Sequence, residues 1–163
     1  MNGLQFRPYA PGDKTACINI FISNTPRYFG VEEVDDFRGF LEAPTCAYFV
    51  TTQNEEILAC GGYGYHDKKK AVVLAWGMVR VDLHKHGLGK FLLVERLKQI
   101  HRDFGETLVL IDTSQHSRGF FEKFGFKATN VIKDFFAPGI DRVDMQLQLN
   151  SEAYASLTNH SNG

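Results

Sequence analysis

The chain has 163 residues, of which 44% are hydrophobic and 23% are charged, as is typical of one globular domain large enough to bury a core. Its formal net charge of -1 gives no electrostatic reason to expect nucleic-acid binding. Cys17, Cys46 and Cys60 are odd in number and not closely spaced, so neither a disulfide framework nor a zinc site is expected. The start of the chain lacks the regions of a signal peptide, and no apolar run reaches membrane-spanning length. We therefore expect a cytoplasmic protein with no membrane partner.

The first half of the chain predicts strands and helices in succession. A short strand is expected at residues 4–8, and apolar residues at helical spacing predict helices over residues 13–23 and 31–41. Strand-forming residues then dominate three segments, residues 47–52, 57–65 and 71–81. Polar turns separate these segments, one of them around Lys68-Lys69-Lys70. They are expected to pair as an antiparallel meander.

The second half alternates helix and strand. A helical pattern from residue 87 to about residue 104 leads into residues 107–113, whose apolar run predicts a fully buried strand. The order strand, helix, strand implies a parallel crossover. The remaining segments predict a helix over residues 117–124, strands over residues 126–132 and 142–149, and a polar tail frayed from about residue 152. The result is a mixed sheet with helices on both faces.

The most informative segment joins the third meander strand to the next helix. Val79 and Val81 alternate as in a half-buried strand, and Gly87 and Gly89 then close a turn into the helix. The first N–H groups of a helix lack carbonyl partners, and the helix dipole adds about half a positive charge there. Glycine lets a phosphate approach the backbone closely, and Lys90 could add a cation. The segment therefore predicts an anion-binding loop.

Two familiar phosphate loops do not fit this segment. A Walker A loop needs glycine where this chain has His84, and Ser or Thr where it has Phe91. A dinucleotide-binding fingerprint needs a third glycine where Leu92 stands. Taken alone, the glycine turn is also compatible with simple punctuation between a strand and a helix.

Two motifs together resemble the GNAT acetyltransferases. Residues 84–89, His-Lys-His-Gly-Leu-Gly, resemble the Arg/Gln-x-x-Gly-x-Gly/Ala loop of that family. Residues 120–126, Phe-Phe-Glu-Lys-Phe-Gly-Phe, resemble its Phe-Tyr-Glu-Lys-Leu-Gly-Phe signature, in the expected order. The resemblance implies a single α/β (α+β) domain over residues 1–150, followed by a polar tail over residues 151–163. The implied sheet is mixed and mostly antiparallel, with helices on both faces and one splayed parallel strand pair.

The resemblance also implies acetyl-CoA as the acyl donor, with its pyrophosphate on the loop. The donor contacts implied are Val79, Val81, His84, Lys85, His86, Gly87, Leu88, Gly89, Lys90, Ser114 and Phe121. The two valines would bind the pantetheine arm through their backbone and place their side chains in the core. His84 replaces the usual Arg or Gln. Because the family binds phosphate mainly through backbone N–H groups, this change affects a side-chain contact more than the site itself.

The implied reaction transfers the acetyl group to a primary amine of a small molecule or protein. A lysine-type amine has a pKa of about 10.4, so a base must accept its proton at neutral pH. Relatives often carry a glutamate where this chain has Leu74-Ala75-Trp76. His116 and Asp112 are our leading catalytic candidates, followed by Glu32, Glu33 and His66. Each of these residues also has a purely structural reading as a helix cap, a surface charge or a turn residue.

The acid side of the reaction is altered as well. The family's tyrosine, which protonates the leaving thiolate, would stand at position 121, where this chain has Phe121. Thiols have pKa values of about 8.5, and a general acid contributes roughly 10²- to 10⁴-fold, so activity could survive. Ser114, Ser117 or water could substitute. The alternative function is a catalytically weak or inert acyl-CoA-binding or sensory module.

Acceptor recognition is expected from Arg27, Tyr28 and Phe29, and from the aromatic loop over residues 134–141. Arg27 could pair with an acceptor carboxylate, although an exposed arginine needs no such role. The histidines offer no third ligand at a suitable spacing, so we expect no metal. The expected partners are acetyl-CoA and an amine, without nucleic acid, in a monomer or homodimer.

Overall fold

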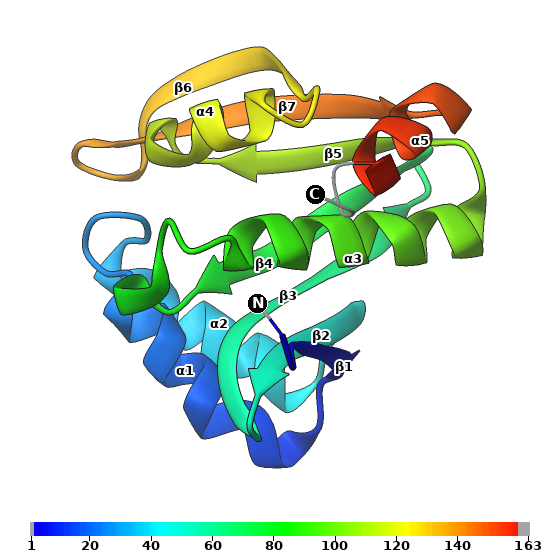
Figure 1. The fold of residues 1–163 in the computed structure, drawn as a ribbon. Coiled ribbons are helices and arrows are strands. Elements are labelled where there is room, and N and C mark those ends of the chain that lie inside the picture. Colours follow the sequence, from blue (N-terminus) through cyan, green and yellow to red (C-terminus); the bar gives the residue numbers. More distant parts are fainter. Residues whose placement is uncertain (1, 160–163) are drawn as a thin grey trace.

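A mixed sheet of seven strands forms the centre of the molecule, in the order β1-β2-β3-β4-β5-β7-β6 (Figure 1). The computed structural model describes residues 2–159. Its strands are β1 (Gln5–Pro8), β2 (Ala47–Gln53), β3 (Glu56–His66), β4 (Ala71–Val79), β5 (Thr107–Thr113), β6 (Lys127–Ala137) and β7 (Ile140–Leu149). Its α-helices are α1 (Lys14–Ser23), α2 (Val34–Glu42), α3 (Leu88–Phe104), α4 (Gln115–Glu122) and α5 (Ser151–Asn159).

The strand pair β4 and β5 is parallel, whereas every other neighbouring pair is antiparallel. The predicted meander of β2, β3 and β4 and the predicted crossover through α3 are both confirmed. Only two residue pairs join β4 to β5, Val72 with Val109 and Val73 with Leu110. From Leu74 to Val79, β4 therefore has β3 on one edge and no strand partner on the other.

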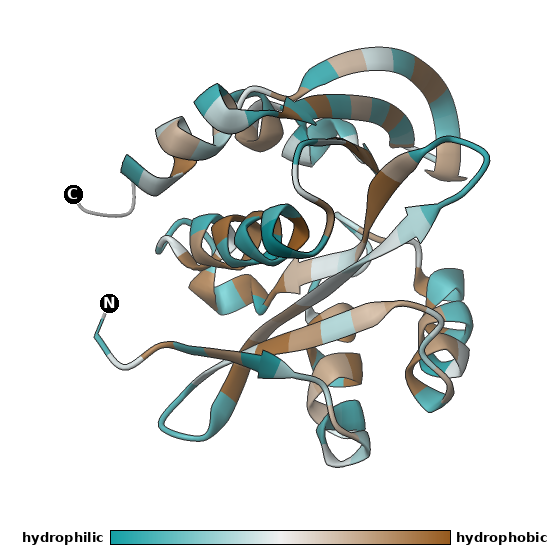
Figure 2. Ribbon diagram, turned by 90° about the vertical axis from the view of Figure 1, so that its right-hand side faces the viewer, coloured by the Kyte–Doolittle hydropathy of each residue, from teal (hydrophilic) through white to brown (hydrophobic). Residues whose placement is uncertain are grey.

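Apolar residues pack on both faces of the sheet. One core lies under α3, α4 and α5 and includes Leu93, Leu97 and Val109. The other lies under α1 and α2 and includes Phe21 and Phe37. Figure 2 shows these hydrophobic stretches in brown along the strands and on the sheet-facing sides of the helices. Each large apolar side chain buried in this way contributes roughly 1.5–3 kcal/mol, so the two cores hold the sheet and helices in one domain.

The helix α3 follows from its local sequence. Apolar residues recur at helical spacing and face the sheet, among them Leu93, Leu97 and Ile100. Gly87 precedes the helix with φ 84°, and Gly105 ends it with φ 67°, a backbone conformation that favours glycine. The helix was predicted at these bounds, and the structure confirms it.

The C-terminal segment differs from its prediction. Residues 151–159 form α5 instead of a frayed tail, and residues 160–163 lie outside the described part of the chain. The helix packs on α3 through Tyr154, whose ring stacks on His101 at 4.1 Å, and through the buried side chain of Leu157. Ser151 donates from both its backbone N–H and its hydroxyl to Glu106, which anchors the helix start. These contacts join residues that are remote in sequence, so the polar composition of the segment does not reveal them.

Three further predictions need correction. The strand β5 is not fully buried: Val109 is buried, whereas Asp112 is exposed, because β4 diverges from this part of the strand. The strand β4 ends at Val79, and Val81 is 43% exposed in a 3-10 turn, not in the core. Residues 134–141 are mostly strand, because β6 and β7 extend almost to the hairpin turn at Gly139.

Among the described residues, no helix is long and apolar enough to span a membrane.

Candidate active site

The glycine loop leads from the end of β4 into α3. Lys85 and Gly87 both have left-handed backbone angles, with φ 65° and 84°. The first backbone bond within α3 runs from the N–H of Phe91 to the carbonyl of Gly87, at 3.0 Å. The N–H groups of Leu88 and Gly89 therefore precede the intrahelical bonds, as expected of a helix start that binds an anion. The glycine turn predicted from sequence therefore ends in a helix start whose first N–H groups have no intrahelical partner.

The backbone at the end of β4 is held by side chains from two other segments. The carbonyl of Val79 accepts a hydrogen bond of 2.9 Å from the buried amide of Asn24, at the end of α1. Nε2 of His84 lies 2.9 Å from the same carbonyl. Because a carbonyl only accepts, Nε2 carries the proton in this contact. The side chain of His84 is thus turned back to the strand, which explains how the loop accommodates a residue other than Arg or Gln.

Tyr28 brings three predicted site segments together. Its ring meets His84 edge-on at 5.1 Å and His116 edge-on at 5.8 Å. The guanidinium of Arg27 lies 5.5 Å from the centre of the same ring. Phe29 behaves differently: it stacks on Phe21 at 4.9 Å in the core under α1 and α2. The structure therefore places Tyr28 beside the loop with Arg27 next to it, whereas the partly buried Phe29 packs against the core.

The carboxylates of Glu33 and Asp112, from distant parts of the sequence, repel each other electrostatically. Glu33 is half-buried, and its Oε2 accepts a hydrogen bond of 2.8 Å from the N–H of Gly30. Burial raises the pKa of Glu33 above its usual value, and the negative charges of Asp36, Asp112 and Glu32 raise it further. A carboxylate with a raised pKa is a better proton acceptor than an ordinary one.

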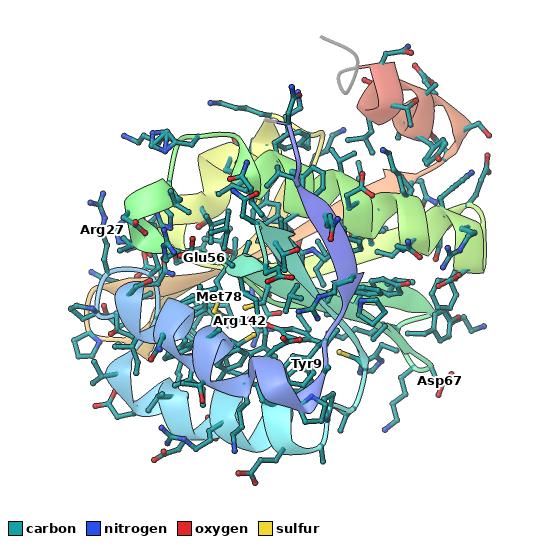
Figure 3. All side chains as sticks on the ribbon, turned by 60° about the horizontal axis from the view of Figure 1, so that its bottom comes forward. Tyr9, Arg27, Glu56, Asp67, Met78 and Arg142 are labelled. Atoms are coloured by element: carbon teal, nitrogen blue, oxygen red, sulfur yellow. The ribbon has the colours of Figure 1, made fainter. Side chains whose placement is uncertain are left out.

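The other two base candidates are less suitably placed. Glu32 is exposed. His66 lies at the turn between β3 and β4, where its Nδ1 accepts a hydrogen bond of 3.2 Å from the N–H of Lys69. Figure 3 shows Asp67, the neighbour of His66, at the opposite end of the molecule from Arg27. His66 therefore belongs to the hairpin and not to the site.

A small cavity opens where β4 and β5 separate. It has a volume of about 190 Å³, and its walls include Val73, Leu110, Asp112, Arg142 and Asp144. Arg142 donates a 2.7 Å hydrogen bond to Asp144, and its Nε lies 3.9 Å from Asp112. The cavity thus combines the last paired residues of the two strands with charged groups of β5 and β7, and one of these groups, Asp112, helps to raise the pKa of Glu33.

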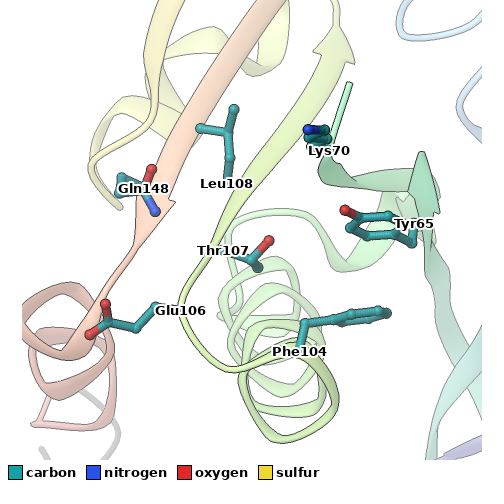
Figure 4. Close-up of a pocket in the computed structure, with 7 residues that line it drawn as sticks. All are labelled: Tyr65, Lys70, Phe104, Glu106, Thr107, Leu108 and Gln148. Atoms are coloured by element: carbon teal, nitrogen blue, oxygen red, sulfur yellow. The ribbon is translucent and has the colours of Figure 1, made fainter. Parts of the chain in front are cut away.

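A larger hollow lies elsewhere and contains no residue of the loop. Its volume is about 590 Å³, and Tyr65, Phe104 and Lys70 lie on its wall (Figure 4). These residues belong to the ends of β3 and α3 and to the turn before β4, at the paired end of β4. Of these two cavities, only the smaller one is lined by a candidate catalytic residue, Asp112.

The helix α4 packs beside the loop, with Ser114 immediately before it. Ser114 is buried, and its carbonyl accepts the N–H of Ser117 at 3.1 Å. Phe121 is buried against Phe120 and Phe126 at ring distances of 5.1 and 5.4 Å. A Cβ on Gly89 would contact the ring of Phe120 at 3.5 Å. Position 121 therefore contributes packing, and its side chain cannot donate a proton.

Sequence reasoning missed Arg96, which is only 3% exposed. It lies on the sheet-facing side of α3, four residues after Leu92 and four before Ile100, both of which are buried. A charged residue inside an apolar stripe is unusual, so the helical periodicity contained the information that could have identified it.

A family model described as "Acetyltransferase (GNAT) domain" matches residues 24–149. The chain belongs to the GNAT acetyltransferase family. The match includes both GNAT motifs, the glycine loop and the segment around Phe121. The predicted family and enzyme class are thereby confirmed. No curated protein matches the chain by sequence.

Solved structures share the GNAT fold over nearly the whole chain. A GNAT-family protein from Desulfovibrio desulfuricans superposes with a TM-score of 0.76 at 24% identity, covering 90% of this chain and 99% of its own. The protein yncA from Salmonella typhimurium, in a structure with acetyl-CoA, superposes with a TM-score of 0.71 at 17% identity, covering 91% of this chain and 95% of its own. The ribosomal-protein-S18-alanine N-acetyltransferase of Escherichia coli superposes with a TM-score of 0.74 at 15% identity, covering 90% of this chain and 94% of its own. At these identities the likeness concerns the fold, and it confirms the predicted one.

Proposed function

We propose that this GNAT protein transfers an acetyl group from acetyl-CoA to a primary amine of a small molecule or protein. The observation that carries the proposal is the unpaired edge of β4, which leads through a short 3-10 turn into the glycine loop. Asp112 lines the cavity where β4 and β5 separate, and its charge helps to raise the pKa of Glu33. Acetyl-CoA as donor is in keeping with yncA, a structural neighbour seen with that cofactor.

The backbone of the loop would hold the donor's pyrophosphate. The N–H groups of Leu88 and Gly89 supply hydrogen bonds and the positive end of the helix dipole. The side chains of Lys85 and His86 are exposed beside this start and suit a negatively charged ligand. The pantetheine arm would continue along the free edge of β4 through the backbone of Val79, and Ser114 would face it from the start of α4.

Glu33 and Asp112 would receive the proton of the amine. The neutral amine nitrogen attacks the thioester carbonyl carbon, and its proton passes to a carboxylate. The carbon–sulfur bond then breaks with its electron pair on sulfur, giving the N-acetylated amine and the CoA thiolate. The rings of Tyr28 and His116 meet at 5.8 Å, and these two side chains would orient the amine. The carboxylate pair replaces the glutamate missing from the stretch around Trp76.

Thiol release tests this function directly. The protein is incubated with acetyl-CoA and a panel of small amines and peptide amines, and free CoA thiol is measured over time. Release that depends on both substrates is the expected result. If acetyl-CoA binds in calorimetry and no amine in a broad panel gives thiol release, the proposal of transfer is wrong.

A second candidate function is an acyl-CoA-binding or sensory module without turnover. The observation that favours it is the burial of Phe121, which leaves no proton donor at the position used by relatives. Trp76 adds to it, because its ring packs on Phe37 at 5.0 Å where relatives often carry a glutamate. Calorimetric binding of acetyl-CoA without turnover would select this candidate.

A further inference from the structure

The buried guanidinium of Arg96 lacks a counterion. Its Nε donates to the carbonyl of Leu92 at 3.4 Å, and its Nη1 donates to the carbonyl of Gly62 at 3.3 Å. Within residues 2–159, no salt bridge joins it to a carboxylate. Burying a cation without a partner opposes folding. The charge therefore calls for an explanation beyond packing.

Two glycines make room for this side chain. A Cβ on Gly77 would lie 2.8 Å from Nη2 of Arg96, and a Cβ on Gly61 would lie 3.2 Å from its Cζ. Either contact is too close for a side chain to be added without movement. The backbone of β3 and β4 is thus in direct contact with the guanidinium, without intervening side chains.

The same glycines mark an irregularity in β4. The register between β3 and β4 shifts here: Cys60 pairs with Met78, but Gly62 pairs with Ala75. Trp76 and Gly77 together therefore face Gly61, which is the arrangement of a β-bulge. Trp76 has φ 47°, and Gly77 is exposed although β4 lies inside the sheet. Gly77 is open because β5 has already diverged.

Arg96 remains charged at neutral pH. Burial lowers its pKa to about 10, which is still well above 7. The titratable groups that face it are the hydroxyl of Tyr48 on β2 and the thiol of Cys60 on β3. Burial raises the pKa of Tyr48, so this group is neutral, and its hydroxyl donates to the carbonyl of Trp76 at 2.7 Å. The positive charge of Arg96 is not cancelled by Tyr48.

We propose that Arg96 stabilises the CoA thiolate as it leaves at the β4 bulge, acting through the backbone of Gly77 and replacing part of the missing proton donor at Phe121. This inference rests on the proposed function. Arg96 is eight residues after Leu88, about 12 Å along the helix axis, so an arm that runs from the loop along β4 passes the bulge. When the carbon–sulfur bond breaks, the electron pair and negative charge pass to sulfur. A fixed cation in a low-dielectric setting stabilises that charge without transferring a proton, which the thiolate takes from water after release.

The test is the thiol pKa of bound CoA, followed by thiolate absorbance in the ultraviolet for the wild-type protein, Arg96→Met, Arg96→Lys and Lys98→Met. We expect the pKa of the bound thiol to lie about one unit below that of free CoA. It should return to the free value in Arg96→Met, remain low in Arg96→Lys, and be unchanged in Lys98→Met, which alters a half-buried ion pair of the same helix. In turnover assays, Arg96→Met should lower kcat about tenfold with little change in the KM for acetyl-CoA.

The possible outcomes separate this inference from the proposed function. A wild-type protein that does not bind CoA contradicts the proposed function itself. A wild-type protein that binds CoA with the thiol pKa of free CoA overturns the role of Arg96 alone, and this result needs no variant. Equal thiol pKa values in wild type and Arg96→Met would also overturn it, provided that binding of CoA lacking the sulfur atom shows an intact site. In that case Arg96 would only fill the space beside the glycines.

Discussion

The two ends of β4 differ in almost every physical respect. At the first end, Val72 and Val73 pair with β5, and Val72 is fully buried in the core under α3. At the second end, from Trp76 to Val79, the strand bulges and keeps one edge unpaired, with the buried charge of Arg96 behind it. The first end contributes stability, whereas the second is irregularly paired and leaves backbone N–H and carbonyl groups without a strand partner on one edge. One strand therefore anchors the core at its first end and offers an open edge to a ligand at its second end.

The largest expected effect is on the open end. Gly89→Val should weaken acetyl-CoA binding by at least about 1,000-fold, or roughly 4 kcal/mol, because the side chain fills the space between the helix start and the ring of Phe120. Valine is compatible with a helix, so the fold should persist. Calorimetry measures the affinity, and Gly39→Val, at a helical glycine with open space around it, is the matched control. If Gly89→Val bound acetyl-CoA with wild-type affinity, the donor would not bind at this loop. Gly87→Val is a poorer test, because φ 84° strains any side chain there.

The next effect concerns the carboxylates. Glu33→Gln should lower kcat about 100-fold while acetyl-CoA affinity is kept, with Asp35→Asn as the control on the same segment. In the wild type, kcat/KM should rise with pH through the raised pKa of Glu33, and this limb should disappear in the variant. A raised carboxyl pKa favours folding at low pH, and this contribution is lost as pH rises through the folded pKa. Glu33→Gln should therefore be the more stable protein at neutral pH. An unchanged pH profile would exclude Glu33 as the base.

A smaller effect is expected at the paired end. Val109→Ala removes two buried carbon atoms and should lower the free energy of unfolding by about 2 kcal/mol. Urea unfolding measures this loss. Acetyl-CoA affinity should stay within about twofold, or roughly 0.4 kcal/mol, of wild type, because the contact lies before the strands separate. A large loss of affinity at unchanged stability would contradict the division between the two ends.

The smallest effect is a gain. Phe121→Tyr restores the hydroxyl that relatives use to protonate the leaving thiolate, and it should raise kcat by up to about tenfold. The gain should be greater in the Arg96→Met background, because both groups act on the same negative charge. Single and double variants are compared by thiol release. If Phe121→Tyr raised kcat by the same factor in the wild-type and Arg96→Met backgrounds, the two positions would act independently.

Local sequence patterns account for much of this fold. The spacing of Leu93, Leu97 and Ile100 predicts α3, and the two glycines predict the loop, because periodicity and turn chemistry depend on neighbouring residues. The α5 helix could not be predicted in this way, since it is stabilised by packing on His101 and by Glu106. The same holds for the site: Glu33 and Asp112 are distant in sequence, and their interaction depends on tertiary packing such as that of Gly30 against the end of β6.

Single side chains were harder to predict than elements. His84 is a predicted donor contact whose ring turns back to Val79, and Phe29 is a predicted acceptor contact whose ring packs against the core. Both outcomes depend on rotamers chosen by tertiary neighbours. The apolar periodicity of α3 predicts the helix but not the role of Arg96, a charged residue within its buried stripe.

The hydrogen bonds at Val79 have a consequence for the order of events. A backbone carbonyl has two lone pairs, and here Asn24 and His84 occupy both. A pantetheine amide that donates to this carbonyl must displace one of them, and His84, the less buried of the two, is the one we expect to leave. Its release would free the edge of Tyr28 for the acceptor, so the two substrates would bind in sequence, with acetyl-CoA first. Initial-rate kinetics with a dead-end CoA analogue distinguish this order from random binding.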